Sequence, residues 1–315
     1  MNRPIAPSAD RSVPHCAKDA VRCVVQSSDV LGETPLWCDR TQSLLWLDID
    51  AGKLQRFHPA TGRHDTFNFD ARYVGTAALC ADTSKILLGM DLGLHLFDIG
   101  SGHCEKLCQV EDPRIDNRLN DGRCDAEGRL WVGSMDNQLH RPSGAFYRVD
   151  PDGSVHRQFD GVIVSNTVAI SPTQERLYFS DTRRFMTWQF DLDVRKGSLG
   201  NRTVFVDHTQ AKDRPDGACV DSEGYVWNAI FAGGRVVRYA PDGRVDAVVQ
   251  VPVTNPTCVC LGGPAMRTLF ITTARKFLDR SRLRAEPLAG AVLAIDVSTP
   301  GLPESRFRCG RALVP

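Results

Sequence analysis

A short apolar strand with a bulky centre recurs six times along the chain, and this repeat constrains the fold more than any other feature. The centres lie at residues 46, 88, 131, 178, 227 and 270, so neighbouring copies are 42 to 49 residues apart. A polar turn precedes each copy, and a second strand followed by a turn such as Pro-Asp-Gly often comes after it. Such turns supply the backbone angles that hairpins need. Helical periodicity is almost absent, so the pattern predicts an all-β protein.

A unit of 40 to 50 residues with about four strands is typical of a propeller blade. Six copies therefore predict an all-β, six-bladed β-propeller spanning residues 19–315, preceded by a loose tail over residues 1–18. A ring has to close, because otherwise the first and last blades expose edge strands. We expect Val21–Val25 to pair with the last blade, near Ala291–Asp296 or Phe307–Cys309.

The composition argues against several classes of partner. The 38 basic and 38 acidic side chains cancel, which disfavours recruitment by nucleic acid or an anionic membrane. No apolar run approaches the roughly 20 residues of a membrane helix, and the N-terminus has no secretory signal, so we expect a cytoplasmic protein. The 11 cysteines form no paired zinc spacing and are predicted to be mostly buried free thiols, without a structural disulfide.

Four oxygen-bearing side chains stand at similar positions before their repeats. Glu33, Asn120, Asn166 and Asp216 lie 11 to 13 residues before the bulky centre of their blade. In a rotationally repeated fold, equivalent offsets give equivalent radius and height, so these side chains are predicted to converge on the axis, as a metal site requires. Alternatively, each residue only caps its own turn, which is its commonest role in a single segment. The shared register favours the site.

Around these residues the chain resembles the senescence marker protein/regucalcin–gluconolactonase family, six-bladed propellers that hydrolyse sugar lactones with one divalent metal ion. The resemblance extends from about residue 22 to 297. The stretches that carry it are Gly32–Trp37, Arg118–Gly122, Ser165–Thr167 with Ser180–Thr182, and Pro215–Gly217 with Asp221–Trp227.

The resemblance implies a role for each matching side chain. Glu33, Asn166 and Asp216 are implied to be the metal ligands, and Arg118 and Asn120 to hold substrate hydroxyls, with Asp121 near them. The sequence departs from the family at two positions, because Thr34 and Thr167 stand where the family usually has glycine, which permits unusual φ angles.

The chemistry expected of such a site is hydrolysis of a sugar (aldono-) lactone to the open-chain sugar acid. Oxygen ligands are hard, so the ion is expected to be Ca²⁺, Mg²⁺, Mn²⁺ or Fe²⁺, with Zn²⁺ as a further candidate. The metal would polarise the lactone carbonyl as a Lewis acid. Either Asp216 acts as general base toward the attacking water or a metal-bound hydroxide attacks.

The segment Asp136–Gly144 interrupts the third blade, and its role has two interpretations. It is predicted either to lie over the pocket and reach the substrate through Gln138, or to be a plain surface connection. Asp125 and Asp221 closely precede their strands and are predicted to be structural.

The sequence leaves two other functions open. The first is a non-enzymatic, regucalcin-like calcium-binding propeller, against which Arg118 beside Asn120 counts as a substrate-side donor pair. The second is an aryl-ester or organophosphate hydrolase on a related propeller, a class that often uses a catalytic histidine. No histidine stands at the equivalent offsets, so a small sugar lactone is the expected partner.

Overall fold

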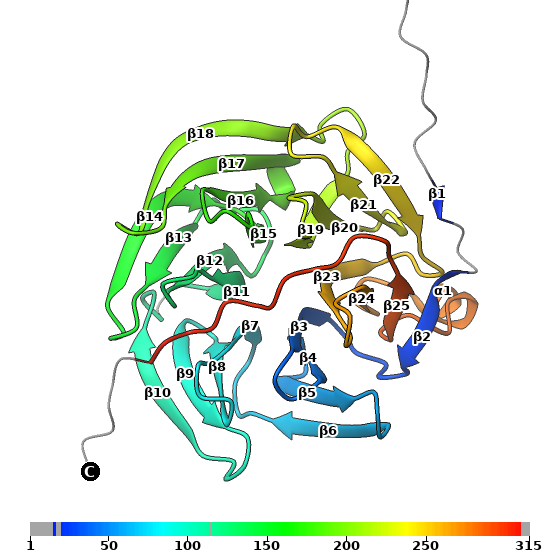
Figure 1. Cartoon of the computed structure of the whole chain (residues 1–315), viewed down its shortest axis with the longest axis horizontal. Coiled ribbons are helices and arrows are strands. Elements are labelled where there is room, and N and C mark those ends of the chain that lie inside the picture. Colours follow the sequence, from blue (N-terminus) through cyan, green and yellow to red (C-terminus); the bar gives the residue numbers. More distant parts are fainter. Residues whose placement is uncertain (1–14, 17–19, 114, 310–315) are drawn as a thin grey trace, which may run out of the picture.

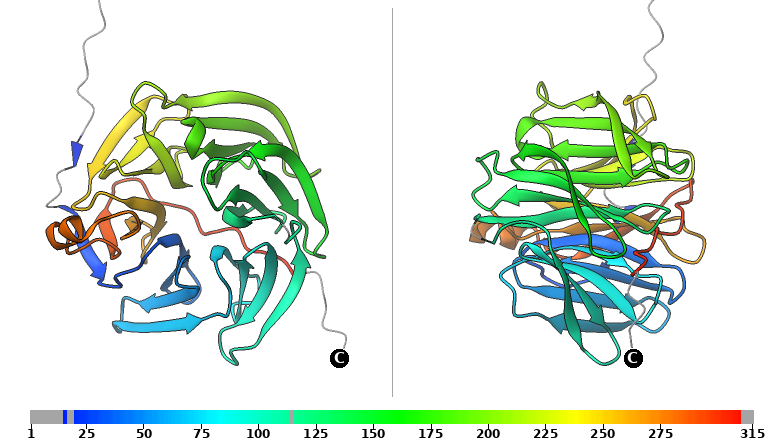
Figure 2. Two further views of the ribbon diagram at one scale, coloured as in Figure 1. Left: turned by 180° about the vertical axis from the view of Figure 1, so that it is seen from behind. Right: turned by 90° about the vertical axis from the view of Figure 1, so that its left-hand side faces the viewer.

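Six β-sheets are arranged around a central axis in the computed structural model, which describes residues 15–16, 20–113 and 115–309 (Figure 1). Each of the six predicted strand centres lies in the second strand of a sheet, counted outward from the axis. The prediction of an all-β, six-bladed β-propeller is confirmed. Figure 2 shows the ring from behind and from its edge.

In every blade but the sixth, whose outermost strand comes from the N-terminal part of the chain, the four inner strands run outward from the axis in chain order. The first three blades contain β3 (Gly32–Cys38), β4 (Ser43–Asp48), β5 (Lys53–His58) and β6 (Arg63–Asn68); β7 (Val74–Leu79), β8 (Lys85–Met90), β9 (Gly93–Asp98) and β10 (Cys104–Gln109); and β11 (Asn117–Cys124), β12 (Leu130–Asp136), β13 (Gly144–Val149) and β14 (Val155–Val162). The last three contain β15 (Ser165–Ile170), β16 (Arg176–Asp181), β17 (Met186–Asp193) and β18 (Ser198–Asp207); β19 (Arg214–Val220), β20 (Val226–Phe231), β21 (Arg235–Tyr239) and β22 (Val245–Gln250); and β23 (Pro256–Gly262), β24 (Thr268–Thr273) and β25 (Val292–Asp296) with β2 (Arg22–Val25).

The N-terminal strand β2 closes the ring. It pairs antiparallel with β25, with Arg22 opposite Ala294, and so becomes the outermost strand of the sixth blade. The first of the two predicted closures is therefore confirmed. The second is wrong, because Phe307 forms a parallel bridge with Cys80 of the second blade instead.

Part of the predicted loose tail is paired with the propeller. β1 (His15–Cys16) lies parallel to β22 and adds a fifth strand to the fifth blade. Residues 1–14 and 17–18 of that tail lie outside the described residues.

Two short helices interrupt the strands between residues 20 and 309. The 3₁₀ turn η2 (Thr182–Arg184) follows β16, and α1 (Arg280–Ala285) lies between β24 and β25. No helix within the described part of the chain has the length and apolar character needed to cross a bilayer.

The apolar repeats form the core between neighbouring blades. All residues of β4 and of β12 are buried, whereas exposed and half-buried residues alternate along most of the outer strand β6. Trp131 and Trp227 of two second strands donate their indole N–H to Asp125 and Asp221, at 2.9 and 3.0 Å. These bonds confirm that both aspartates are structural. All ten cysteines whose side chains are described are free thiols.

In every blade, the pairing of the innermost strand with the second strand slips at one point. The slips fall between Glu33 and Leu36, Val74 and Thr76, Asn120 and Gly122, Asn166 and Ala169, Pro215 and Ala218, and Pro256 and Cys258. A bulge re-aims the side chains beside it. The repeated bulge therefore explains why the four residues at matched offsets all face one end of the axis.

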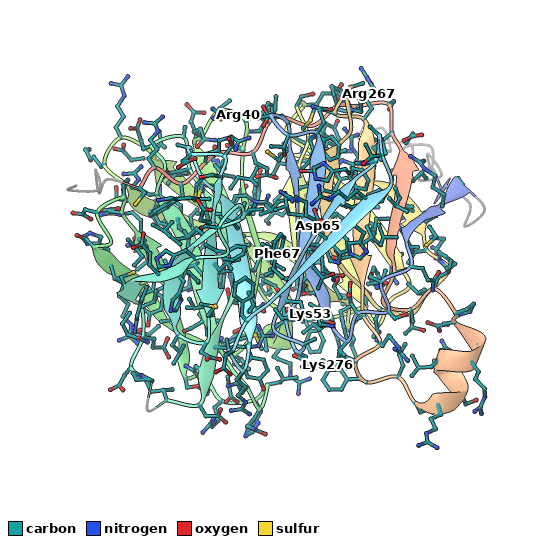
Figure 3. The ribbon with its side chains drawn as sticks, turned by 90° about the horizontal axis from the view of Figure 1, so that it is seen from below. Arg40, Lys53, Asp65, Phe67, Arg267 and Lys276 are labelled. Carbon is teal, nitrogen blue, oxygen red and sulfur yellow. The ribbon has the colours of Figure 1, made fainter. Side chains whose placement is uncertain are left out.

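The opposite end of the axis is crossed by the C-terminal strap, which we define as residues 299–309. Figure 1 shows it running over the ring, and Figure 3 shows it at the end marked by Arg40 and Arg267, away from Lys276. Its backbone bonds the fifth, sixth and second blades, with Ser222 donating to Pro300, Gly301 to Met266 and Phe307 to Leu79. The strap thus ties one face of the propeller together.

Candidate active site

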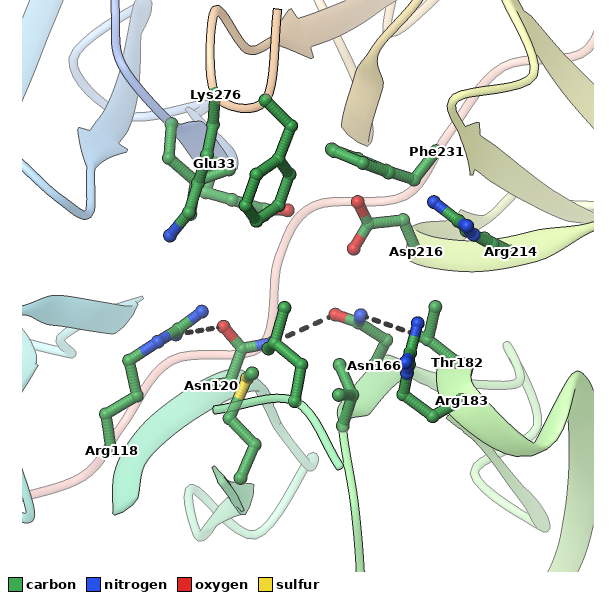
Figure 4. Close-up of a pocket in the computed structure, with 15 residues that line it drawn as sticks. Glu33, Arg118, Asn120, Asn166, Thr182, Arg183, Arg214, Asp216, Phe231 and Lys276 are labelled. Carbon is green, nitrogen blue, oxygen red and sulfur yellow. Dashed lines mark hydrogen bonds between the residues drawn. The ribbon is translucent and has the colours of Figure 1, made fainter. Parts of the chain in front are cut away.

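The structure brings five of the seven predicted site residues together in one pocket at the end of the axis away from the strap (Figure 4). These five are Glu33, Arg118, Asn120, Asn166 and Asp216. They come from the innermost strands of four blades, β3, β11, β15 and β19. The pocket encloses about 650 Å³ including its open mouth. Its other lining residues are Leu31, Met135, Leu139, Val164, Thr182, Arg183, Arg214, Phe231, Lys276 and Phe277.

Two buried carboxylates face this pocket without a salt bridge among the described residues. Burial, followed by repulsion from Asp121, raises the pKa of Glu33 to about 8. Burial, followed by repulsion from Glu33, raises the pKa of Asp216 well above its ordinary value. Like charges held together away from water destabilise each other, and a cation between them removes that penalty.

The donor set fits a hard divalent ion. Glu33 and Asp216 supply carboxylate oxygens, and Asn166 supplies an amide oxygen. No three His, Cys, Asp or Glu side chains gather as a metal site in the ranges that the structure describes, and this set contains only two of them. The ion would therefore take its third protein oxygen from an amide and keep positions open for other ligands.

A chain of hydrogen bonds sets the orientation of the two amides. Asn120 Nδ2 donates to Asn166 Oδ1 at 3.0 Å, and Asn166 Nδ2 donates to Thr182 Oγ1 at 2.8 Å. The Thr182 hydroxyl donates its only hydrogen to the carbonyl of Pro215, at 2.7 Å, so it has to accept from Asn166. The Asn166 oxygen is thereby fixed toward Asn120, and it keeps a second lone pair.

Arg118 is a buried cation held by neutral groups. Its guanidinium donates to Asn120 Oδ1 and to the Leu119 carbonyl, and it lies over the Tyr73 ring at 5.6 Å. Burial lowers its pKa, and the nearby carboxylates of Asp50 and Glu33 oppose that shift. An arginine has five N–H donors, so Arg118 retains donors for a ligand.

The structure does not bring the other two predicted residues to the pocket wall. The buried carboxylate of Asp121 accepts the backbone N–H groups of Gly122 and Val168, both at 2.8 Å. Gln138 is exposed and donates to Asp116 at 3.4 Å. The loop does reach the pocket, but through Leu139, so a substrate role for Asp121 or Gln138 has no support in this geometry.

The two threonines that replace the usual glycines have the left-handed backbone conformation. Thr34 has φ of +48° and Thr167 has φ of +55°, which is strained for β-branched residues. The Thr167 hydroxyl donates to the Asp216 carbonyl at 2.6 Å and accepts from Asn228 at 3.1 Å. The Thr34 hydroxyl is buried and has no hydrogen-bond partner in the described part of the chain. Only Thr167 therefore gains a contact in exchange for its strain.

The sequence reasoning missed several pocket residues that lie at strand ends and in loops. Thr182 and Arg214 border or belong to the motif stretches, so a signal for them was present. Arg183, Lys276 and Phe277 lie in connections that follow no repeat, and nothing in their spacing pointed to the pocket.

The fold and the site together define a six-bladed propeller with a polar pocket at one end of its axis. The family model described as "SMP-30/Gluconolactonase/LRE-like region" matches residues 31–275, and the chain belongs to this family.

Individual relatives match over almost their whole length. The 6-deoxy-6-sulfogluconolactonase of Pseudomonas putida is 36% identical, over 92% of this chain and 99% of that protein. The L-arabinolactonase of Azospirillum brasilense is 34% identical, over 90% of this chain and 94% of that protein. Among solved structures, the calcium-binding protein regucalcin of Agrobacterium tumefaciens aligns with a TM-score of 0.88 and 31% identity, covering 94% of this chain and 99% of that chain.

Proposed function

We propose that the protein is a metal-dependent lactonase that hydrolyses a sugar lactone to the open-chain sugar acid. The observation that carries this proposal is the convergence of Glu33, Asn166 and Asp216 on one pocket, beside the donor Arg118 and the Asn120 amide that binds it. The names of two relatives, a sulfogluconolactonase and an arabinolactonase, support lactones as the substrate class.

A divalent cation held by Glu33, Asn166 and Asp216 would supply Lewis-acid polarisation of the lactone carbonyl. The hard oxygen set favours Ca²⁺, Mg²⁺, Mn²⁺ or Fe²⁺, with Zn²⁺ as a further candidate. Water adds to the carbonyl carbon, the ring C–O bond breaks, and the ring oxygen leaves as a hydroxyl after taking up a proton. The Asp216 carboxylate would accept the proton of the attacking water.

The remaining pocket residues would bind and orient the sugar. Asn120 donates its two amide hydrogens to the Ser165 carbonyl and to Asn166 Oδ1, and its own oxygen accepts from Arg118. Asn120 would therefore hold Arg118 in place, and the remaining N–H groups of Arg118 would bind ligand hydroxyls. Phe231 and Phe277 contact each other edge to face, with centroids 6.3 Å apart, and form an apolar wall suited to the C–H face of a sugar.

The test is acid release from a panel of five- and six-membered aldonolactones, followed with a pH indicator against spontaneous hydrolysis. We expect EDTA treatment to remove the activity and one of the ions named above to restore it. Ion binding measured by calorimetry, with no acid release from any lactone, would instead support a calcium-binding propeller without enzyme activity. Acid release that EDTA leaves intact would overturn the metal dependence.

A further inference from the structure

Two arginines at the pocket mouth have no counter-ion among the described residues. Arg183 and Arg214 both line the pocket, and the guanidinium of neither forms a salt bridge or hydrogen bond within the described ranges. The carboxylate beside each one is already occupied. Arg184 pairs with Asp181, which precedes η2.

The same arrangement recurs one blade further along the ring. Arg235 binds both oxygens of Asp213, at 2.5 and 2.6 Å, so the carboxylate that precedes Arg214 in the chain is engaged. In each of the two blades, one arginine is bound to the local carboxylate and another is left facing the pocket.

The two free arginines belong to adjoining parts of the site. Thr182, which precedes Arg183, donates its hydroxyl to the carbonyl of Pro215, which follows Arg214, at 2.7 Å. Figure 4 shows both side chains on the same side of the pocket, away from Arg118. The hydrogen bond thus links the two chain segments that carry these arginines, and both guanidinium groups face the same pocket.

The other charged side chains of the pocket do not neutralise Arg183 and Arg214. Lys276 is bound to Asp50, at 2.8 Å. Glu33 and Asp216 are the carboxylates that the proposed metal ion neutralises. The mouth of the loaded pocket therefore carries an excess of positive charge, although the whole chain has a formal net charge of zero.

We propose that Arg183 and Arg214 form an anion subsite, and that the preferred substrate is an aldonolactone bearing an oxyanion group on the carbon chain away from its carbonyl. A sulfonate, carboxylate or phosphate offers the oxygens that planar guanidinium groups bind through paired hydrogen bonds. This inference rests on the proposed lactonase function and narrows its substrate class.

The test compares lactones that share one ring and differ only at carbon 6. Glucono-1,5-lactone is the neutral member, and its 6-deoxy-6-sulfo, 6-carboxyl and 6-phosphate counterparts are the anionic arms. We expect the wild type to show a kcat/KM at least about tenfold higher for one anionic arm than for the neutral lactone, since charge-assisted hydrogen bonds are the stronger kind. The preference for the anionic lactone should weaken with added salt, because Arg183 and Arg214 are both exposed.

The variant Arg183→Gln/Arg214→Gln should lower the anionic-to-neutral ratio by about tenfold or more. Arg195→Gln/Arg202→Gln removes the same charge from exposed residues outside the pocket and should keep the wild-type ratio. Taking the ratio within one protein cancels differences in folding and metal content. A second readout needs no turnover: calorimetry should find that 1,5-anhydroglucitol 6-sulfate binds more tightly than 1,5-anhydroglucitol.

The outcomes separate this inference from the proposed function. Equal use of neutral and anionic lactones, or an unchanged ratio in Arg183→Gln/Arg214→Gln, would overturn the subsite and leave the lactonase standing. A ratio that falls equally in the control variant would also overturn it, as an effect of overall charge. Arginine-dependent binding of the 6-sulfate without opening of any lactone would retain the subsite and overturn the lactonase.

Discussion

The two ends of the propeller axis differ in whether their buried charges are paired. At the end crossed by the C-terminal strap, Arg123 donates to Glu304 at 2.5 Å and to the carbonyl of Ala218 at 2.8 Å. Asp221 is bound by Arg238 at 2.7 Å. At the pocket end, Glu33 and Asp216 share one small space without an ion-pair partner among the described residues.

This difference separates groups that stabilise the fold from groups held ready for a ligand. A buried pair with additional hydrogen bonds offsets its own desolvation, whereas unpaired buried carboxylates destabilise the folded state. Proteins retain such local costs where function needs them. Strand β19 runs from the pocket end to the strap end, because Asp216 lies near its start and Asp221 follows its end.

The largest expected effects on activity and stability come from changing Asp216 and Asp221 in separate variants. Asp216→Asn should lower lactone hydrolysis by at least about a hundredfold, since it removes a metal ligand and a proton acceptor. The same change should leave the metal-free protein equally stable or about 1 kcal/mol more stable, because one of two repelling carboxylates is gone. Acid-release kinetics and urea unfolding of the EDTA-treated protein measure the two effects.

Asp221→Asn is the matched control at the other end of β19. It loses the ion pair with Arg238 and should lower the free energy of unfolding by about 3 kcal/mol. A destabilised Asp216→Asn protein, or an Asp221→Asn protein as stable as the wild type, would contradict the contrast between the two ends.

The next largest effect concerns the buried ion pair between Arg123 and Glu304 at the strap end. Arg123→Met leaves Glu304 nearly buried and unpaired, at 14% side-chain exposure, and should lower the free energy of unfolding by about 3 kcal/mol. Arg123→Met/Glu304→Met should recover most of that loss, because no unpaired charge remains. Urea unfolding of the single and double variants completes a double-mutant cycle.

An exposed pair supplies the control for this cycle. Arg244 and Asp242 form an ion pair at 81% and 55% side-chain exposure, and Arg244→Met should cost less than about 1 kcal/mol. If the double variant stayed as unstable as Arg123→Met, packing of the strap rather than pairing of charge would explain the loss.

Periodicity accounts for what could be predicted from the sequence. The apolar repeat predicted all six blades, and the matched offsets predicted that Glu33, Asn120, Asn166 and Asp216 would face one pocket. Both results follow from rotational symmetry, which converts equal spacing into equal position. The predicted roles of these residues remain predictions.

Single-residue backbone geometry accounts for what could not be predicted. Asp121 lies next to Asn120, but at φ of +53° within the bulge its carboxylate turns to backbone N–H groups instead of the pocket. In the loop of the third blade, the pocket residue is Leu139, at φ of +61°, rather than Gln138. Arg183 belongs to no repeat and Arg214 begins the innermost strand of the next blade, so only the folded chain identifies them as neighbours.

The smallest expected effect is a difference in stability between glycine variants of the two strained threonines, Thr34 and Thr167. Thr34→Gly should raise the free energy of unfolding by about 1 kcal/mol, because it removes left-handed strain and a buried hydroxyl without a partner. Thr167→Gly relieves similar strain but loses the bonds of the Thr167 hydroxyl to the Asp216 carbonyl and to Asn228, so we expect a net change near zero. Thr167→Gly should also weaken metal binding measured by calorimetry, since the backbone that carries Asp216 becomes less constrained. Equal stabilisation by both substitutions would mean that the Thr167 hydroxyl contributes nothing to holding Asp216, and the pocket end would then be shaped by strand geometry alone.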